Sequence, residues 1–397
     1  MRASEALSYE PAACWQRLQQ SNPEFFFEDL DGLMKEQHQQ FLEALMGYER
    51  ECFINAHPYQ RSEQRVDHAN GFYRRHLTTR LGVMELKVPR TRSGHFHSQV
   101  LPRYQRREPV INEALKEVFL LGVSTRQTGR ALATLVEDAV SAATVSAVAK
   151  ALDESVGSFH RRKLADEYRY LIFDGVSVRI RLVGKVQRRM ALCAYGITEQ
   201  GKRELIDFQI AKAEGEDTWY AFLWNLWSRG LRGELLELIA TDGQSGLIKA
   251  LGRLWPAVPH QRCWAHKLRN LENKLKASQG TCLDEAKLIY QAPHRTEAIQ
   301  RFRKWKRDWQ KQAPKAVACL ESDLEELLAF FDCPQAHWKR LRTTNVIERL
   351  FVEVRRRIRT MCAFTTRSSC ERILYSVFNR MNQNWSRHPL PHFTHNS

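Results

Sequence analysis

Three carboxylates in this 397-residue sequence have residue types and surroundings suited to metal chemistry. Asp174 ends the apolar run of "LIFDG", Asp242 ends that of "LIATDG", and Glu348 lies in the helical stretch "TTNVIERLFVEVRRR". Carboxylates supply the hard, anionic oxygens that Mg²⁺ or Mn²⁺ accepts, and such an ion keeps positions for water and substrate phosphates. Two ions about 3.5 to 4 Å apart can stabilise both reacting oxygens of an in-line phosphoryl displacement. If the three side chains converge, they predict metal-dependent phosphoryl transfer.

The two aspartates also have a simpler interpretation as turn residues. Asp-Gly is a common hairpin dipeptide, and both Asp174 and Asp242 precede a glycine. However, strand-like sequence flanks Asp174 on both sides, and the residues after Asp242 lead from a strand into a helix, where a hairpin turn has no role. We therefore expect both carboxylates near or at the exit of a strand.

Glu348 has two possible roles. With Asn345 as the N-cap, Glu348 would be the N3 residue of a capping box. It has no cationic residue three or four positions away, whereas Glu353 lies four positions from both Arg349 and Arg357 and is explained by helix ion pairs. Cap and metal ligand both remain open at this point.

The elements that must position these side chains are readable from hydrophobic spacing. Strands are expected at 170–181, 187–198, 203–211 and 235–243, and helices at 216–231 and 244–255. Residues 275 to about 335 are helical and charged, and one face of the Glu348 helix is apolar: Ile347, Leu350, Phe351, Val354, Ile358 and Met361. Three consecutive strands followed by alternating helix and strand predict an α/β fold with a mixed sheet.

Composition indicates the substrate class. The net charge is +16 with pI near 9.6, and clustered Lys and Arg bind phosphates by releasing counterions, so nucleic acid is the expected partner. An anionic membrane surface is the rival, but no apolar run reaches the roughly 18 residues of a spanning helix. Nine scattered cysteines and a start without a signal-peptide core favour a cytoplasmic, nucleoid-associated protein.

The first 155 residues are expected to bind DNA. Residues 1–60 are helical, and 61–110 contain two short strands joined near Gly82; residues 61–107 hold eleven Lys or Arg against three acids. We expect Arg74, Arg75 and Arg80 to contact phosphates, although a solvated loop is the alternative. Residues 111–155 have the outline of a helix-turn-helix, in which Lys150 faces outward; a purely structural three-helix unit is the alternative.

Four motifs in order, "FDG", "TDG", "RCWAHKLRNL" and "TTNVIERLFVEVRRR", resemble the mutator-type transposases of bacterial insertion sequences, a branch of the DDE transposases. The resemblance implies a ribonuclease H-like catalytic domain, at 165–385, with a helical insertion at about 275–335. It implies that Asp174, Asp242 and Glu348 are the catalytic triad, and the 106 positions from Asp242 to Glu348 leave room for the insertion.

The resemblance also assigns Cys263 and His266 to a Cys-x-x-His element. One Cys and one His are at most half a zinc site, so packing and hydrogen bonding beside the active site is the favoured role, with direct contact to DNA as the alternative.

The sequence thus predicts a transposase that uses Mg²⁺ or Mn²⁺, two ions in all, to cut and join DNA. Its partner would be double-stranded DNA, namely the element's terminal repeats and the target DNA. We expect a homo-oligomer to bind this DNA, and we expect no membrane partner. Further DNA contacts are expected from Arg355, Arg356 and Arg359 on the Glu348 helix. The rivals are a regulator or domesticated transposase that binds DNA without cutting it, and a nuclease of the same fold.

Overall fold

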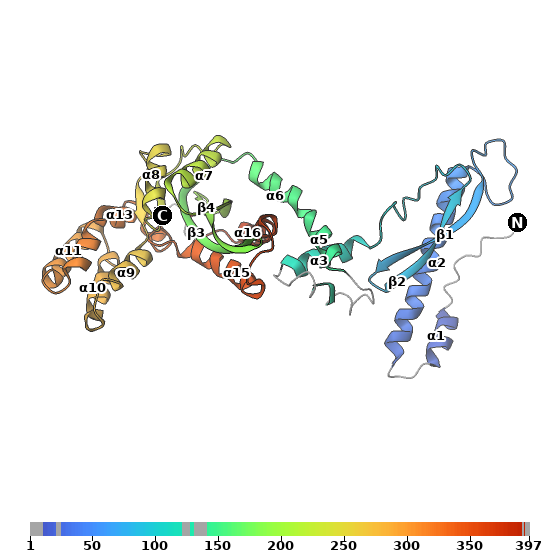
Figure 1. Cartoon of the computed structure of the whole chain (residues 1–397), viewed down its shortest axis with the longest axis horizontal. Coiled ribbons are helices and arrows are strands. Elements are labelled where there is room, and N and C mark those ends of the chain that lie inside the picture. The colour runs from blue at the N-terminus through green and yellow to red at the C-terminus, as the bar shows by residue number, and fades with distance from the viewer. Residues whose placement is uncertain (1–10, 21–24, 121–127, 131–140, 391–392, 394–397) are drawn as a thin grey trace. The chain divides into compact units, whose positions relative to one another are not determined.

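The computed structural model describes residues 11–20, 25–120, 128–130, 141–390 and 393 (Figure 1). The chain divides into two compact units, Met1–Lys150 and Ala151–Ser397, which we describe separately. No helix in the described ranges has the length and apolarity needed to cross a bilayer.

The first unit is a helix-covered hairpin followed by short helices. Its elements are α1 (Pro11–Gln19), α2 (Phe26–Ile54), β1 (Ala69–Thr79), β2 (Gly82–Thr91), α3 (Pro109–Leu120) and α5 (Ala142–Lys150). The two predicted strands are confirmed, and Met46 of α2 packs with Leu77 and Met84 of the hairpin. Ser141 caps α5, because its hydroxyl accepts from the Thr144 amide at 3.1 Å. Most of the predicted middle helix lies outside the described residues, so the helix-turn-helix stays a prediction.

The second unit holds a five-stranded sheet and its helices. Its elements are α6 (Leu152–Arg161), β3 (Tyr168–Leu182), β4 (Lys185–Thr198), β5 (Arg203–Ala211), α7 (Glu216–Ser228), β6 (Leu238–Thr241), α8 (Ser245–Leu254), β7 (His260–Arg262), α9 (Trp264–Glu272), α10 (Gly280–Tyr290), α11 (Arg295–Trp309), α12 (Pro314–Glu321), α13 (Leu324–Leu328), α14 (Trp338–Leu341), α15 (Asn345–Met361) and α16 (Arg367–Arg387). Short 3₁₀ helices lie at Ala277–Gln279, Ala329–Asp332 and Gln335–His337. The α/β class with a mixed sheet is therefore confirmed, as is the helical character of 275–335.

The sheet order is β5-β4-β3-β6-β7. β5, β4 and β3 pair antiparallel, whereas β3, β6 and β7 run parallel. The strand at the far edge, β7, was not predicted, because three residues are too few to show a period. The central strand β3 is buried on both faces along its first nine residues except for Arg169 and Gly175, which explains why it reads as an apolar run.

Helices cover both faces of the sheet. Phe173 of β3 packs with Trp219 of α7 and Leu247 of α8 in one core. On the other face α16 approaches the strands, with the rings of Tyr195 and Trp385 centred 5.4 Å apart. Because successive side chains of a strand alternate between faces, Asp174 points to the α16 side.

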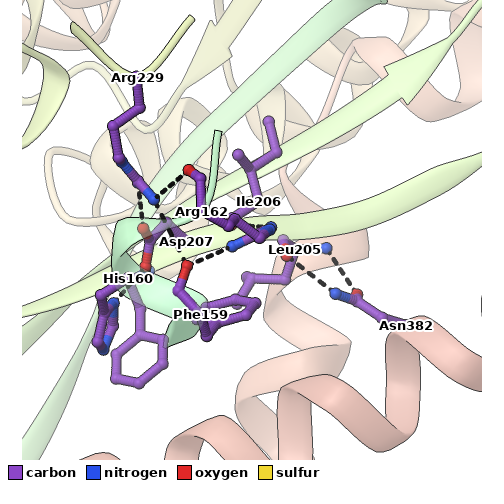
Figure 2. Close-up of polar contacts among 9 residues, drawn as sticks. Phe159, His160, Arg162, Leu205, Ile206, Asp207, Arg229 and Asn382 are labelled. Carbon is purple, nitrogen blue, oxygen red and sulfur yellow. Dashed lines mark hydrogen bonds and ion pairs between the residues drawn. The ribbon is translucent and has the colours of Figure 1, made fainter. Parts of the chain in front are cut away.

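A buried charge cluster ties α6 and α7 to the edge strand β5 (Figure 2). Asp207 of β5 is only 2% exposed, and its carboxylate pairs with Arg229 at the end of α7 and with His160 Nδ1 of α6 at 2.7 Å. Asn382 of α16 satisfies backbone groups at the edge of β5: its side chain accepts from the Leu205 amide at 2.8 Å and donates to the Leu205 carbonyl at 3.0 Å. The cluster closes an otherwise exposed strand edge.

Replacing Asp207 with alanine should destabilise the protein by about 3 to 5 kcal/mol, because Arg229 would stay buried without its partner. Chemical denaturation measures this difference. Asp308→Ala, at an exposed aspartate, is the matched control and should change the unfolding free energy by less than about 0.5 kcal/mol. Equal changes in the unfolding free energy for the two substitutions would show that the buried charge cluster does not stabilise the fold.

Candidate active site

Asp174 lies in the middle of β3, opposite Cys193 of β4. The prediction of a strand exit is wrong for this residue, because eight further residues of β3 follow it; the hairpin-turn alternative is wrong for the same reason. Its side chain is 7% exposed, and one carboxylate oxygen accepts a hydrogen bond from the Gly175 amide at 2.7 Å. A nearly buried carboxylate in the central strand requires a compensating partner.

Asp242 lies directly after β6, as predicted for a strand exit. Phe173 of β3 is in register with Thr241 of the parallel strand β6, so the next residues, Asp174 and Asp242, come from neighbouring strands. The Asp242 carboxylate accepts from the Gln244 amide at 2.9 Å, and the Gln244 side chain caps α8 by accepting from the Leu247 amide at 2.7 Å. The chain turns here into a helix, so a hairpin is excluded for Asp242 too.

Glu348 lies in the first turn of α15. The capping box is wrong: the helix starts at Asn345, its N-cap is Thr344, and no side chain caps it. No cation lies beside Glu348 on its own helix, but Arg269 of α9 donates to its carboxylate at 3.1 Å, and His266 Nε2 is 3.6 Å away. The helix face predicted to be apolar is buried at Ile347, Leu350, Phe351 and Val354, while the side chains of Ile358 and Met361 lie outside the described residues.

The pKa of Asp174 responds to its burial and to the other two carboxylates. Burial raises the pKa of Asp174 to about 7; the negative charges of Asp242 and Glu348 act in the same direction, and His266 opposes them. Carboxylates in a low dielectric repel each other unless a cation neutralises them, and their oxygens are of the type that divalent ions such as Mg²⁺ accept. The residues that the structure describes present no group of three or more His, Cys, Asp and Glu side chains arranged to hold a metal.

A fourth carboxylate, Glu214, lies near Asp242 and against the backbone of β3, and was missed from sequence. A Cβ at Gly175 would lie 1.8 Å from Glu214 Oε1, so the carboxylate rests against the glycine backbone of β3. Burial, followed by the charge of Asp242, raises the pKa of Glu214. Gln244 fixes its loop by donating to the Glu214 carbonyl at 2.9 Å. Glu214 does not follow an apolar run in the sequence. Only its close contact with the backbone of Gly175 identifies it as a candidate site residue.

Cys263 and His266 position the start of α15. Cys263 is fully buried directly after β7, and its sulfur accepts from the Thr344 amide at 3.2 Å and hydroxyl at 3.4 Å. A hydrogen bond with Cys263 is the largest of the influences that raise the pKa of His266 to about 9; burial opposes it. These contacts join β7 and α9 to the turn that presents Glu348, which supports the role in packing and hydrogen bonding.

We expect the Cys-x-x-His element to hold no structural zinc. Metal analysis of purified protein should find zinc well below one equivalent, with the same content in a Cys263→Ala variant. Stoichiometric zinc that disappears in the variant would contradict this prediction.

The arginines proposed for phosphate binding differ in their surroundings. Arg74 pairs with Glu85 at 2.9 Å and Arg80 with Glu108 at 3.5 Å, and both arginines are exposed. Arg75 instead donates to backbone carbonyls, including that of Pro102 at 3.3 Å, which gives it a structural role. Four further predicted contacts, Lys150, Arg355, Arg356 and Arg359, are exposed. DNA contact by any of the seven stays a prediction.

Arg74→Ala combined with Arg80→Ala should flatten the salt dependence of duplex binding. Each lost phosphate contact lowers the slope of log K against log salt by about 0.9, so the pair should lower it by roughly 1.8. Fluorescence anisotropy between 50 and 200 mM salt measures the slope. An unchanged slope would remove these two arginines from the DNA interface, and Arg75 is left in place because its loss would disturb the loop it holds.

The chain is similar to bacterial transposases over most of its length. The family described as "Transposase, Mutator family" matches residues 10–388. The transposase for insertion sequence element ISRM5 of Rhizobium meliloti (strain 1021) is 35% identical over 366 residues, 92% of this chain and 89% of the relative. The transposase for IS406 of Burkholderia multivorans is 36% identical, covering 85% and 87% of the two chains. The transposase for IS256 in transposon Tn4001 of Staphylococcus aureus is 35% identical, covering 86% and 88%.

Proposed function

This chain belongs to the Mutator family of transposases, and from that premise we propose that it binds the ends of a bacterial insertion sequence and cuts and joins DNA with Asp174, Asp242 and Glu348. One observation carries the proposal. Asp174 and Asp242 come from neighbouring parallel strands, and Glu348 is near enough to add to the charge felt by Asp174. The mixed five-stranded sheet, with α10–α13 between β7 and α15, supports a ribonuclease H-like catalytic domain with a helical insertion.

The three carboxylates would hold Mg²⁺ or Mn²⁺, two ions in all. When bound, the metal would supply Lewis-acid stabilisation of the attacking and leaving oxygens of the phosphate. Asp174 and Asp242 would hold the site rigidly, because Asp174 lies within β3 and Asp242 directly follows β6 of the same sheet, while Cys263 and Thr344 fix the helix turn that carries Glu348. Water would first attack the phosphate at the element end and displace a 3′ oxygen, which leaves as a free hydroxyl. That hydroxyl would then attack a target phosphate and displace the target's own 3′ oxygen, so no serine or tyrosine nucleophile is required.

A strand-transfer assay tests the proposal. A supercoiled plasmid carrying the element ends is incubated with the protein and Mg²⁺, and nicked and joined products are separated on a gel. Joined products support a transposase. Cleavage without joining would show a nuclease of the same fold, and binding to the ends without cleavage would show a regulator or a domesticated protein.

A further inference from the structure

A basic cleft of about 940 Å³ opens beside Glu348 within the second unit. Its walls come from α15, α14 and the residues after it, α9, the end of α10, β5 and α16. Among the lining residues that the structure describes, seven are Lys or Arg, and Glu348 is the one acidic residue. The cleft therefore places a concentrated positive charge beside Glu348, one of the three candidate carboxylates.

The fold explains only part of this charge: Arg342 donates to the Tyr290 carbonyl at 3.3 Å, and Arg203 lies over the Trp385 ring. Among the residues that the structure describes, no carboxylate pairs with Lys339, Arg340, Arg349 or Arg355, so the helix ion pair expected between Arg349 and Glu353 is not formed. Arg269 has an acidic partner in the cleft, and that partner is Glu348 itself. Like charges that face one another across a concave surface raise the free energy of the folded state unless an anion binds between them. The cleft is thus suited to a polyanion.

The cleft is also partly apolar. Val352 is 55% exposed on α15, between Arg349 and Arg355 along the helix, and Met381 and Tyr290 contribute further half-buried apolar surface. A paired duplex presents phosphates outward and keeps its base faces stacked, so it would leave these side chains in water. An unpaired strand offers both phosphates and base faces to one groove.

We propose that this cleft binds a single DNA strand whose bases are unpaired, next to the phosphate that is cut. The identity of the nucleic acid rests on the proposed function, whereas the preference for a single strand rests on the cleft. Lys339, Arg349 and Arg355 would contact successive phosphates, and Val352 would lie against a base. The strand would be separated locally before cleavage.

The test compares two triple variants of the full chain. The first variant removes three positive charges from the cleft by the substitutions Lys339→Ala, Arg349→Ala and Arg355→Ala. Arg303→Ala, Lys304→Ala and Lys311→Ala remove the same charge from exposed positions of α11 and just after it. The probes are a 12-nucleotide single strand, the same strand with abasic sites, and a duplex of equal length. Anisotropy gives affinity and salt slope, and thermal unfolding checks that both variants fold.

The cleft variant should bind the single strand at least about tenfold more weakly and lose roughly 2 in salt slope, since each single-strand phosphate contact contributes about 0.7. The control should stay within about twofold, and the wild type should bind the abasic strand more weakly than the intact one. Equal losses in both variants, a larger loss on duplex, or full affinity for the abasic strand would overturn the inference. If the wild type joins DNA while the cleft variant binds normally, the cleft inference fails and the proposed function stands. If the cleft variant loses binding but the wild type neither cuts nor joins, the proposed function fails instead.

Discussion

Replacing Glu348 with glutamine is expected to lower strand cleavage and joining by about 100- to 1000-fold without unfolding the protein. Glutamine keeps the size of the side chain but replaces two charged oxygens with a neutral amide, which is a poor ligand for Mg²⁺. Metal stabilisation of the reacting oxygens contributes several kcal/mol, and each 1.4 kcal/mol is tenfold in rate. The fold should tolerate the change, because Glu348 is not a cap and its partner Arg269 is exposed.

Glu353→Gln is the matched control. Glu353 lies five positions further along α15, so it projects from a different side of the helix. The Glu353→Gln variant should cleave DNA at a rate within about twofold of the wild type. Cleavage by the two variants is measured side by side in Mg²⁺, with thermal unfolding as a second readout. Wild-type cutting by Glu348→Gln would show that the carboxylate holds no metal and that the assigned triad is wrong.

The strands that carry Asp174 and Asp242 could be predicted from sequence because each is long or strongly apolar. The third strand was predicted at 203–211 and is β5 (Arg203–Ala211). The expected strand at 170–181 already enclosed Asp174, and the expectation of a strand exit was wrong because an Asp-Gly pair normally ends a strand. Here Gly175 serves another purpose, since a side chain at this position would collide with Glu214.

Side-chain partners from distant elements were beyond the reach of the sequence. The positions three and four residues from Glu348 on its own helix hold no cation, but its partner Arg269 lies on α9, 79 positions earlier. The structural role of Cys263 likewise cannot be seen in the sequence, because its hydrogen-bond donor, Thr344, lies 81 positions later. Hydrophobic periodicity reports the face that a helix buries, and it says nothing about which polar groups meet across the fold.

At Asp174 the ionised carboxylate that a metal site requires should lower the stability of the metal-free fold. Burial raises its pKa to about 7, whereas an unfolded aspartate titrates near 3.9. The folded protein therefore holds an extra proton between about pH 4 and 7, and its stability falls as pH rises through this window. At neutral pH the ionised carboxylate costs the folded state up to about 4 kcal/mol. A bound divalent cation would remove much of that cost.

Asp174→Asn should therefore abolish cleavage yet raise the melting temperature in EDTA at pH 7.5 by roughly 5 °C, because the neutral amide removes the repulsion from Asp242 and Glu348. Below pH 4 the two proteins should melt at similar temperatures. Mg²⁺ or Mn²⁺ should raise the melting temperature of the wild type but not of the variant, since a ligand stabilises only a protein that binds it. Asp308→Asn, at an exposed position, is the control and should melt like the wild type. If Asp174→Asn melts lower than the wild type in EDTA and responds equally to Mg²⁺, Asp174 is a structural residue and the carboxylates do not form a metal site.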